Sequence, residues 1–165
     1  MNFSLRPWTL NDIDSLTKYA NNYNVSKYLC HIPFPYTKEN AQQFIEMAMS
    51  KKLANIFCID VNNEAIGGIG IHPQQGVQYK NAELGYWIAE PFWNNGIITK
   101  VILQIVEYGF ANFDINRIYA STFGSNMASQ KVLIKCGFIL EAKFEKTFYK
   151  NEVYFDELVF AIRKK

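Results

Sequence analysis

The sequence contains no apolar run near the length of about 18 residues that a membrane helix needs, and no signal-peptide core near its N-terminus. Its three cysteines, Cys30, Cys58 and Cys136, form no Cys-x-x-Cys pair. Each lies in apolar sequence, which favours buried thiols in a reducing compartment over disulfides. These absences predict a cytoplasmic protein that does not insert into a membrane.

The sequence also lacks an excess of charge of one sign, since its net charge is +2. The lysines that gather near the C-terminus are not interleaved with aromatic residues, so we read them as a solvated face and expect no nucleic acid partner. Apolar residues make up 49% of the chain and aromatic residues 16%, which excludes a disordered protein. With 165 residues, the chain is long enough for one domain with a core of its own, and we expect a single domain over residues 1–165.

Hydrophobic periodicity predicts alternating strands and helices, that is, a mixed α/β fold. A capping box at Thr9 and Asp12 predicts a helix that runs to about Asn21, and Thr37 is expected to cap another helix. Gly137 is expected to end the helix that starts at Asn126. The predicted strands cover residues 3–6, 53–60, 64–71, 80–89, 115–122, 138–149 and 153–162, with turns at Asn62-Asn63 and at Lys150-Asn151-Glu152.

Residues 90–106, EPFWNNGIITKVILQIV, place two asparagines and a glycine between an apolar strand and an apolar helix. The first amides of a helix have no partner inside it and carry a partial positive charge. Small residues at Asn94, Asn95 and Gly96 let an anion such as a phosphate approach these amides, and Thr99 adds a hydroxyl. An ordinary tight turn explains the same spacing equally well. The stretch has neither a Walker loop nor a dinucleotide fingerprint.

The stretches AELGYWIAEPFWNNGIITKVI and NRIYASTFGSNMASQKVLIKCGFILEA resemble the GNAT superfamily of acyl-CoA-dependent N-acetyltransferases, and most of all its Rim-type members. Rim-type enzymes acetylate the N-termini of ribosomal proteins. The likeness extends to LRPWTLNDID near the start and to YKNEVYFDELVFAI near the end, so it covers nearly the whole chain. It implies an α/β domain with a seven-stranded, V-splayed mixed sheet and about four helices.

The resemblance implies acetyl-CoA as the acyl donor and no metal. Asn126 resembles the asparagine that contacts CoA in the family, a role it can combine with capping a helix. The family has a glycine or alanine at the place of Ile98, so we expect the Ile98 side chain to point into the core. Pantetheine is expected on the backbone of Trp87, Ile88 and Ala89, and the pyrophosphate on the amides of Asn94, Asn95, Gly96, Ile97, Ile98 and Thr99.

Transfer of an acetyl group to an amine needs a base that removes a proton from the amine, and a donor that protonates the leaving thiolate. Glu83 is the first candidate for the base, because family members often carry a glutamate on this strand, and His31 is the second. The resemblance implies Ser129 as the donor, since Leu133 replaces the tyrosine that many relatives use. Structural roles are the alternatives, an ion pair for Glu83 and a helix cap for Ser129. Phe148 stands where a Rim-type relative has its glutamate base.

The acceptor is expected to be a primary amine, either on a small molecule or at the N-terminus of a peptide such as a ribosomal protein. The aromatic loop CHIPFPYT at residues 30–37 contains no acid, which argues against polyamine and aminoglycoside acceptors. These acceptors remain an alternative, as does a protein that binds CoA without turnover, as a sensor or structural partner. The chain is expected to act as a monomer or a homodimer.

Overall fold

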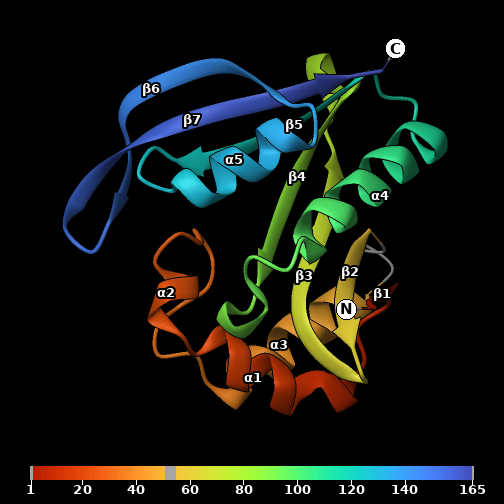
Figure 1. Cartoon of the computed structure of the whole chain (residues 1–165), viewed down its shortest axis with the longest axis vertical. Coiled ribbons are helices and arrows are strands. Elements are labelled where there is room, and N and C mark those ends of the chain that lie inside the picture. The colour runs from red at the N-terminus through yellow and green to blue at the C-terminus, as the bar shows by residue number, and fades with distance from the viewer. Residues whose placement is uncertain (1, 51–54, 165) are drawn as a thin grey trace. The chain divides into compact units, whose positions relative to one another are not determined.

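Seven strands form one mixed sheet in the computed structural model, which describes residues 2–50 and 55–164. They are β1 (Ser4–Arg6), β2 (Ile56–Val61), β3 (Glu64–Pro73), β4 (Asn81–Ile88), β5 (Arg117–Phe123), β6 (Ile139–Lys150) and β7 (Val153–Arg163). Their order in the sheet is β1-β2-β3-β4-β5-β7-β6 (Figure 1). The β4–β5 pair is parallel, whereas β1–β2, β2–β3, β5–β7 and β6–β7 are antiparallel. The predicted α/β class and seven-stranded mixed sheet are confirmed, and the splay between strands stays a prediction.

The described residues form five α-helices, where about four were expected. They are α1 (Ile13–Ala20), α2 (Tyr23–Ser26), α3 (Lys38–Met49), α4 (Ile97–Asn112) and α5 (Met127–Lys135). Three single turns of 3₁₀ helix accompany them, η1 (Leu10–Asp12), η3 (Gly76–Gln78) and η4 (Glu90–Phe92). The unpredicted helix, α2, is one turn long. It forms because the side chain of Asn22 accepts a hydrogen bond of 2.8 Å from the amide of Asn24 and thereby caps the turn.

The predicted helix caps are present. The Asp12 carboxylate accepts hydrogen bonds from both the amide and the hydroxyl of Thr9, at 2.9 and 3.1 Å. The helix predicted from Thr9 begins there as η1 and continues as α1, which ends one residue before Asn21. At the start of α3 the cap is reciprocal, because the Thr37 amide donates to Oδ1 of Asn40 and the Asn40 amide donates to the Thr37 hydroxyl. These polar side chains satisfy amides that lack partners within a helix.

Two-residue turns close the hairpins β2–β3 and β6–β7. Asn62 and Asn63 have φ of +53° and +65°, and Asn151 and Glu152 have φ of +49° and +62°. Positive φ at both central positions matches the twist of the flanking strands. Lys150, predicted in the turn, belongs to β6. Positions 53 and 54 of the predicted second strand lie outside the described residues.

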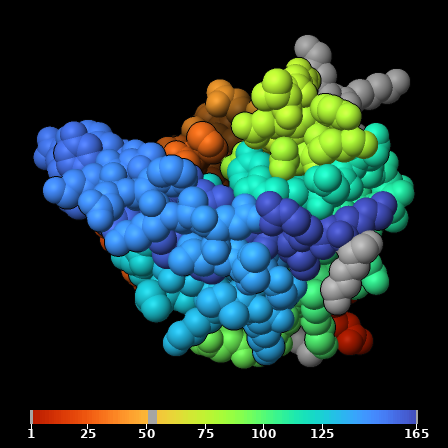
Figure 2. Space-filling model, turned by 90° about the horizontal axis from the view of Figure 1, so that it is seen from above, coloured from red at the N-terminus to blue at the C-terminus, as the bar shows by residue number. Residues whose placement is uncertain are grey.

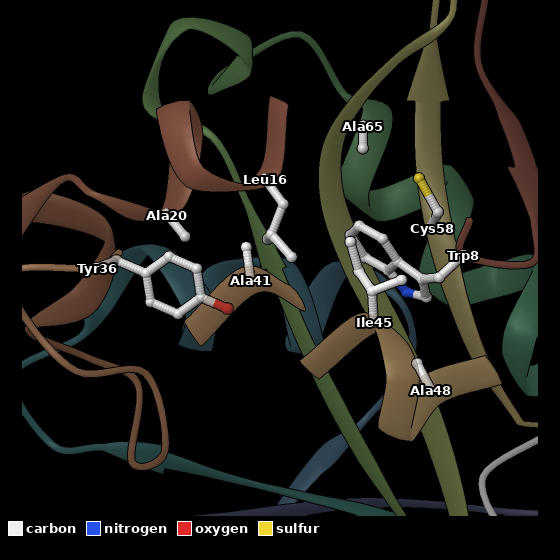
Figure 3. Close-up of a cluster of buried hydrophobic side chains, with 9 residues drawn as sticks. All are labelled: Trp8, Leu16, Ala20, Tyr36, Ala41, Ile45, Ala48, Cys58 and Ala65. Atoms are coloured by element: carbon white, nitrogen blue, oxygen red, sulfur yellow. The ribbon is translucent and has the colours of Figure 1, made fainter. Parts of the chain in front are cut away.

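The chain divides into two units, which we describe separately. The first unit comprises Met1–Gly70 and Tyr86–Val101, and the second unit comprises Ile71–Gly85 and Ile102–Lys165. The expectation of one domain over residues 1–165 stays a prediction. The core of the first unit gathers around the Trp8 ring, which meets Phe44 edge to face at 5.3 Å between centroids. Figure 3 shows nine of its buried side chains: Trp8, Leu16, Ala20, Tyr36, Ala41, Ile45, Ala48, Cys58 and Ala65.

In the second unit, Gly109 lets α4 pack closely on the sheet. A Cβ at this position would lie 2.4 Å from Cδ1 of Ile71 and 3.1 Å from Cδ1 of Ile118, so a larger residue would require the ends of these side chains to shift. Gly137 has φ of +88° and ends α5 as predicted, while the Phe138 amide donates to the Leu133 carbonyl at 3.0 Å.

The edge strand β6 and its neighbour β7 present apolar side chains to solvent. Both strands are blue in Figure 2, where they cover much of the visible surface. Tyr149 and Tyr154 are each 62% exposed, and their rings lie 4.7 Å apart between centroids. The oligomeric state, monomer or homodimer, stays a prediction.

One prediction about the cysteines was wrong. Cys58 and Cys136 are buried, but Cys30 is exposed in the segment between α2 and α3. Burial raises the pKa of the Cys58 thiol to about 12, so this side chain behaves as an apolar core residue.

Candidate active site

The chain turns sharply between the end of β4 and the start of α4. The amide of Ala89 donates a hydrogen bond of 2.8 Å to the carbonyl of Ile66, which holds this end of β4 against β3. Asn94 and Gly96 then adopt φ of +62° and +71°. Glycine and asparagine adopt this left-handed conformation at the lowest cost. The asparagine and glycine therefore have a conformational role in addition to leaving the backbone accessible.

The start of α4 has the features of the predicted anion site. No heavy atom lies within 4 Å of the place where a Cβ of Gly96 would be, so the space beside this residue is open. The first bond within the helical ladder runs from the Lys100 amide to the Gly96 carbonyl, at 3.3 Å. The amides of Ile97 and Ile98 come before that bond and have no acceptor inside the helix. They carry the partial positive charge of the helix N-terminus.

The expectation for Ile98 was wrong. Ile97 is the buried residue at this point, with 2% exposure, and Ile98 is only half-buried. The buried stripe of α4 therefore starts at Ile97 and continues through Val101 and Ile102. Because α4 begins one residue after Gly96, the residue next to the glycine takes the inward position.

The backbone at the end of β4, predicted to bind pantetheine, already has side-chain and main-chain partners. The indole nitrogen of Trp93 donates a hydrogen bond of 2.8 Å to the Ile88 carbonyl. Asn95 in turn donates from Nδ2 to the Trp93 carbonyl at 3.1 Å. The ring of Trp87 packs over Gly68, where a Cβ would come within 3.0 Å of the indole nitrogen. The Trp87 side chain thus belongs to the core of the first unit.

Glu90 connects this turn to α2, a link that the sequence did not predict. Its carboxylate accepts a hydrogen bond of 2.7 Å from Nδ2 of Asn22 and one of 3.1 Å from Nδ2 of Asn24. Asn22 caps α2 with its oxygen at the same time. One glutamate therefore fixes both asparagines at the start of the short helix.

The start of α5 in the second unit is capped as expected. The side-chain oxygen of Asn126 accepts a hydrogen bond of 3.2 Å from the amide of Ser129. Ser129 is half-buried, and Leu133 is fully buried in the core. Phe148 lies against Phe123 at 4.8 Å between ring centroids, so an aromatic contact occupies the place of the relative's glutamate.

Glu83 lies on β4, exposed, and pairs with Tyr119 of β5 in the parallel register. Its neighbours Ala82 and Leu84 are buried, so buried and exposed residues alternate from Ala82 to Gly85, whereas the three residues that follow are all half-buried. Within residues 2–50 and 55–164, no lysine, arginine or histidine nitrogen lies within 4 Å of its carboxylate. The structure thus gives no support to an ion pair as the role of Glu83.

The two histidines occupy different surroundings. His31, the second candidate for the base, is exposed in the segment between α2 and α3 of the first unit. His72 is half-buried and is the second-last residue of β3, in the part of this strand that lies in the second unit. Burial lowers the pKa of His72, and the negative charge of Glu83 partly opposes this effect.

Two further polar groups on β5 were not predicted. Burial raises the pKa of Tyr119, and the charges of Glu83 and Glu157 add to this effect, while Arg117 opposes it. Ser121 donates a hydrogen bond of 2.8 Å to the carboxylate of Glu157 on β7. Alternation along β5 puts Tyr119 and Ser121 on one face, but only the strand pairing reveals which acids lie beside them.

Among the described residues, no three histidine, cysteine, aspartate or glutamate side chains are grouped so that they could hold a metal ion. The described helices also include none that is long and apolar enough to cross a membrane.

The sequence model of the Acetyltransferase (GNAT) domain family matches residues 2–139. The chain therefore belongs to the GNAT acetyltransferase family, and its class of activity is that of an N-acetyltransferase.

Curated relatives carry the same activity in their names. N-acetyltransferase YoaA of Bacillus subtilis is 38% identical over 61% of this chain, a match that spans 56% of that relative, less than two thirds of its length. N-acetyltransferase p20 of Bacillus licheniformis is 31% identical over 82% of this chain and 78% of its own length. The ribosomal-protein-serine acetyltransferase of Escherichia coli is 25% identical over 78% of this chain and 73% of its own.

Solved structures share the fold. A GNAT-family acetyltransferase from Bacillus anthracis superposes with a TM-score of 0.86 at 24% identity, over 99% of this chain and 95% of that one. The microcin C7 self-immunity acetyltransferase MccE, solved with acetyl-CoA and AMP, superposes with a TM-score of 0.84 at 24% identity, over 98% of this chain and 92% of that one. The ribosomal L7/L12 acetyltransferase RimL, in complex with coenzyme A, superposes with a TM-score of 0.84 at 21% identity, over 99% of this chain and 94% of that one.

Proposed function

We propose that this protein transfers the acetyl group of acetyl-CoA to a primary amine by direct attack of the amine on the thioester. The observation that carries the proposal is the turn at Asn94–Ile98. Asn94 and Gly96 are left-handed there, the space beside Gly96 is open, and the helix amides that follow lack intrahelical acceptors. A pyrophosphate is a suitable ligand for such a turn, because it is doubly anionic and accepts several hydrogen bonds. Membership of the GNAT family supports the same donor.

The donor would bind through backbone groups for most of its length. The pyrophosphate would accept hydrogen bonds from the amides of residues 94–99, and the pantetheine would pair with the backbone of Trp87, Ile88 and Ala89. Asn126 is proposed as a further contact of CoA. No metal is needed in this scheme, since the helix N-terminus supplies the positive potential.

The acceptor that we propose is the N-terminal amine of a peptide or protein. Two observations support it: the name of the Escherichia coli relative, and the absence of any acidic residue from residues 28–36. A polyamine or an aminoglycoside carries several positive charges and would need acids there. An α-amine has a pKa of about 7.7–8.0 and loses its proton more readily than a lysine, whose pKa is about 10.4. Glu83 is proposed as the residue that removes the proton, and Ser129 as the donor to the leaving thiolate.

Release of free thiol from acetyl-CoA in the presence of an amine panel tests this function. The panel needs peptides with free N-termini, the same peptides with N-terminal blocks, a polyamine and an aminoglycoside. We expect thiol release with free N-termini and little with the blocked peptides. Thiol release with the polyamine equal to that with free peptide N-termini would contradict a peptide N-terminus as the acceptor. Tight binding of acetyl-CoA without release in any mixture would identify a CoA-binding module and refute the proposed transfer.

A further inference from the structure

His72, Glu83 and Tyr119 occupy neighbouring positions on three adjacent strands of the second unit. Glu83 is paired with Tyr119 across β4 and β5. The amide of Gln74 donates a hydrogen bond of 2.9 Å to the carbonyl of Asn81, which sets the register of the β3–β4 hairpin. Two residues further along each strand, His72 comes opposite Glu83. Opposite residues on neighbouring strands share a face, and neighbouring strands lie about 4.8 Å apart, so the three residues form a row.

The charges along this row affect one another. The Glu83 carboxylate acts on His72 from one side and on Tyr119 from the other. Beyond Tyr119, Arg117 of β5 stacks on the phenol ring, with its Cζ 4.8 Å from the centroid, and Glu157 of β7 adds negative charge. Since the pKa of His72 is lowered by burial and that of Tyr119 is raised, the imidazole is neutral and the phenol protonated near pH 7. The row thus pairs a carboxylate with an imidazole that can accept a proton.

The space beside the row is open. Gly85 lies two residues after Glu83 on the same face of β4, and no heavy atom lies within 4 Å of the position that its Cβ would occupy. Glu83 itself is exposed. A histidine that only fills a core has no need of a solvent-accessible carboxylate opposite it and an uncovered glycine beside that carboxylate.

We propose that Glu83 and His72 act as one proton-accepting pair, in which Glu83 takes the proton from the ammonium group of the acceptor and His72 receives it. This inference rests on the proposed acetyl transfer and assigns a second residue to it. In water an imidazole, with a pKa of about 6.5, is closer than a glutamate, with one of about 4.3, to an amine near 8. Burial lowers the pKa of His72 below its value in water, and the negative charge of Glu83 partly opposes this lowering. Tyr119 stays protonated and adds no second negative charge to the row.

The protons balance as follows in each turnover. The acceptor ammonium loses one proton to Glu83 and then His72, which becomes an imidazolium. The neutral amine attacks the thioester carbonyl, a C–N bond forms and the C–S bond breaks. The Ser129 hydroxyl gives its proton to the departing sulfur, which leaves as the thiol, and the second proton of the nitrogen restores that hydroxyl. His72 then returns its proton to solvent, so the net products are the acetylated amine, free CoA thiol and one proton.

The pairing of His72 with Glu83 can be tested without turnover. The chain has only two histidines, so their ring signals can be followed separately by NMR during a pH titration. We expect Glu83→Gln to lower the pKa of His72 further, because it removes the negative charge that stabilises the imidazolium, and to leave the His31 titration unchanged. Glu107→Gln, which removes an exposed carboxylate on α4, is the matched control and should affect neither. An unchanged His72 titration in Glu83→Gln overturns the pair.

Its catalytic role is tested by the pH profile of kcat/KM for thiol release. In the wild type, the acidic limb should follow the His72 titration measured by NMR. His72→Gln should remove that limb and lower kcat/KM at neutral pH by about 10–100-fold, while the affinity for acetyl-CoA stays the same. If His72 is only structural, His72→Gln should lower the melting temperature and leave the pH profile of kcat/KM unchanged, and this result would refute the proposal. Loss of the acidic limb of the profile in His31→Gln instead would also refute it. If the wild type shows no turnover with any amine, both the proposed acetyl transfer and the proton-accepting pair are wrong. If the wild type turns over and His72→Gln keeps the same rate, only the proton-accepting pair is wrong.

Discussion

The indole N–H of Trp93 donates a hydrogen bond of 2.8 Å to the main-chain carbonyl of Ile88, the last residue of β4. Ile88 is one of the backbone positions at which we propose that pantetheine binds. A pantetheine amide at this oxygen would share it with the indole or displace the indole. Either event changes the surroundings of the Trp93 ring.

Acetyl-CoA should therefore change the tryptophan fluorescence, and Trp93→Phe should remove most of that change. The affinity of the variant should stay within about tenfold of the wild type, because one hydrogen bond contributes only about 0.5–1.5 kcal/mol. Trp8 is the internal control, because it is 2% exposed and lies in the core of the first unit. If Trp93→Phe shows the full fluorescence change, the donor does not bind beside Ile88.

Gly96→Asp should weaken acetyl-CoA binding at least 100-fold with little loss of folding. The new carboxylate would project into the open space at the helix start and repel the pyrophosphate. Because φ at this position is +71°, any side chain adds some strain, and Gly96→Asn controls for it with a similar shape and no charge. Calorimetry on both variants separates charge from strain. Equal affinities of Gly96→Asp and wild type would place the anion elsewhere.

Glu83→Gln and Ser129→Ala should affect different kinetic constants. Loss of the proposed base should lower kcat/KM by about 10²–10⁴-fold. Ser129→Ala removes a hydroxyl that helps only when charge gathers on sulfur, so kcat should fall by about 10–10³-fold with little change in either KM.

Asn126→Ala provides the comparison of melting temperature for a lost cap at this helix, since removing the cap should cost about 1 kcal/mol of stability. Kinetic constants and melting temperatures from the same preparations decide between the two roles. A Ser129→Ala enzyme with normal kcat and a lowered melting temperature would make this serine a structural residue.

Stability should fall in acid because of an ion-pair network in the first unit. Arg6 donates to both Asp12 and Asp60, with its Nη2 2.7 Å from an oxygen of each. Burial raises the pKa of Asp12, but the bonds from Arg6 and Thr9 outweigh this effect and hold it below its usual range. A carboxyl with a lowered pKa stabilises the fold above its unfolded pKa of about 3.9, and this contribution is lost as the pH falls below that value.

Asp12→Asn should therefore destabilise the protein by about 3 kcal/mol at pH 7 and flatten the acid side of the stability curve. Urea unfolding at several pH values measures both effects. Asp14→Asn is the matched control, because Asp14 is 80% exposed in its side chain and its pair with Lys38 should contribute little. An Asp12→Asn curve parallel to the wild type at all pH values would contradict this account.

The local features of the fold could be read from the sequence, because their causes lie within a few residues. Thr9 and Thr37 cap helices through side chains three residues away, and Asn62-Asn63 makes a turn because asparagine tolerates positive φ. The row of His72, Glu83 and Tyr119 could not be read in this way. It depends on the register of three strands, and the β4–β5 register pairs residues far apart in the chain.

In the candidate site, too, the features with a local cause could be read from the sequence and the others could not. The turn at Asn94–Gly96 has a local signal, because a glycine between a strand and a helix marks it. Whether Ile97 or Ile98 points inward depends on the residue at which the helix begins, and a shift of one residue reverses the answer. The bond between Trp93 and Ile88 has no sequence signal at all.

The melting temperature of the protein with acetyl-CoA, NAD and ATP, each at the same concentration, tests the central claim most directly. At a hundredfold excess over its Kd, acetyl-CoA should stabilise the fold by about 2.7 kcal/mol. For a chain of this length the melting temperature should then rise by about 5–10 °C, with little change for NAD or ATP. Equal shifts with all three ligands, or none with acetyl-CoA, would contradict the claim that this turn binds the acetyl donor.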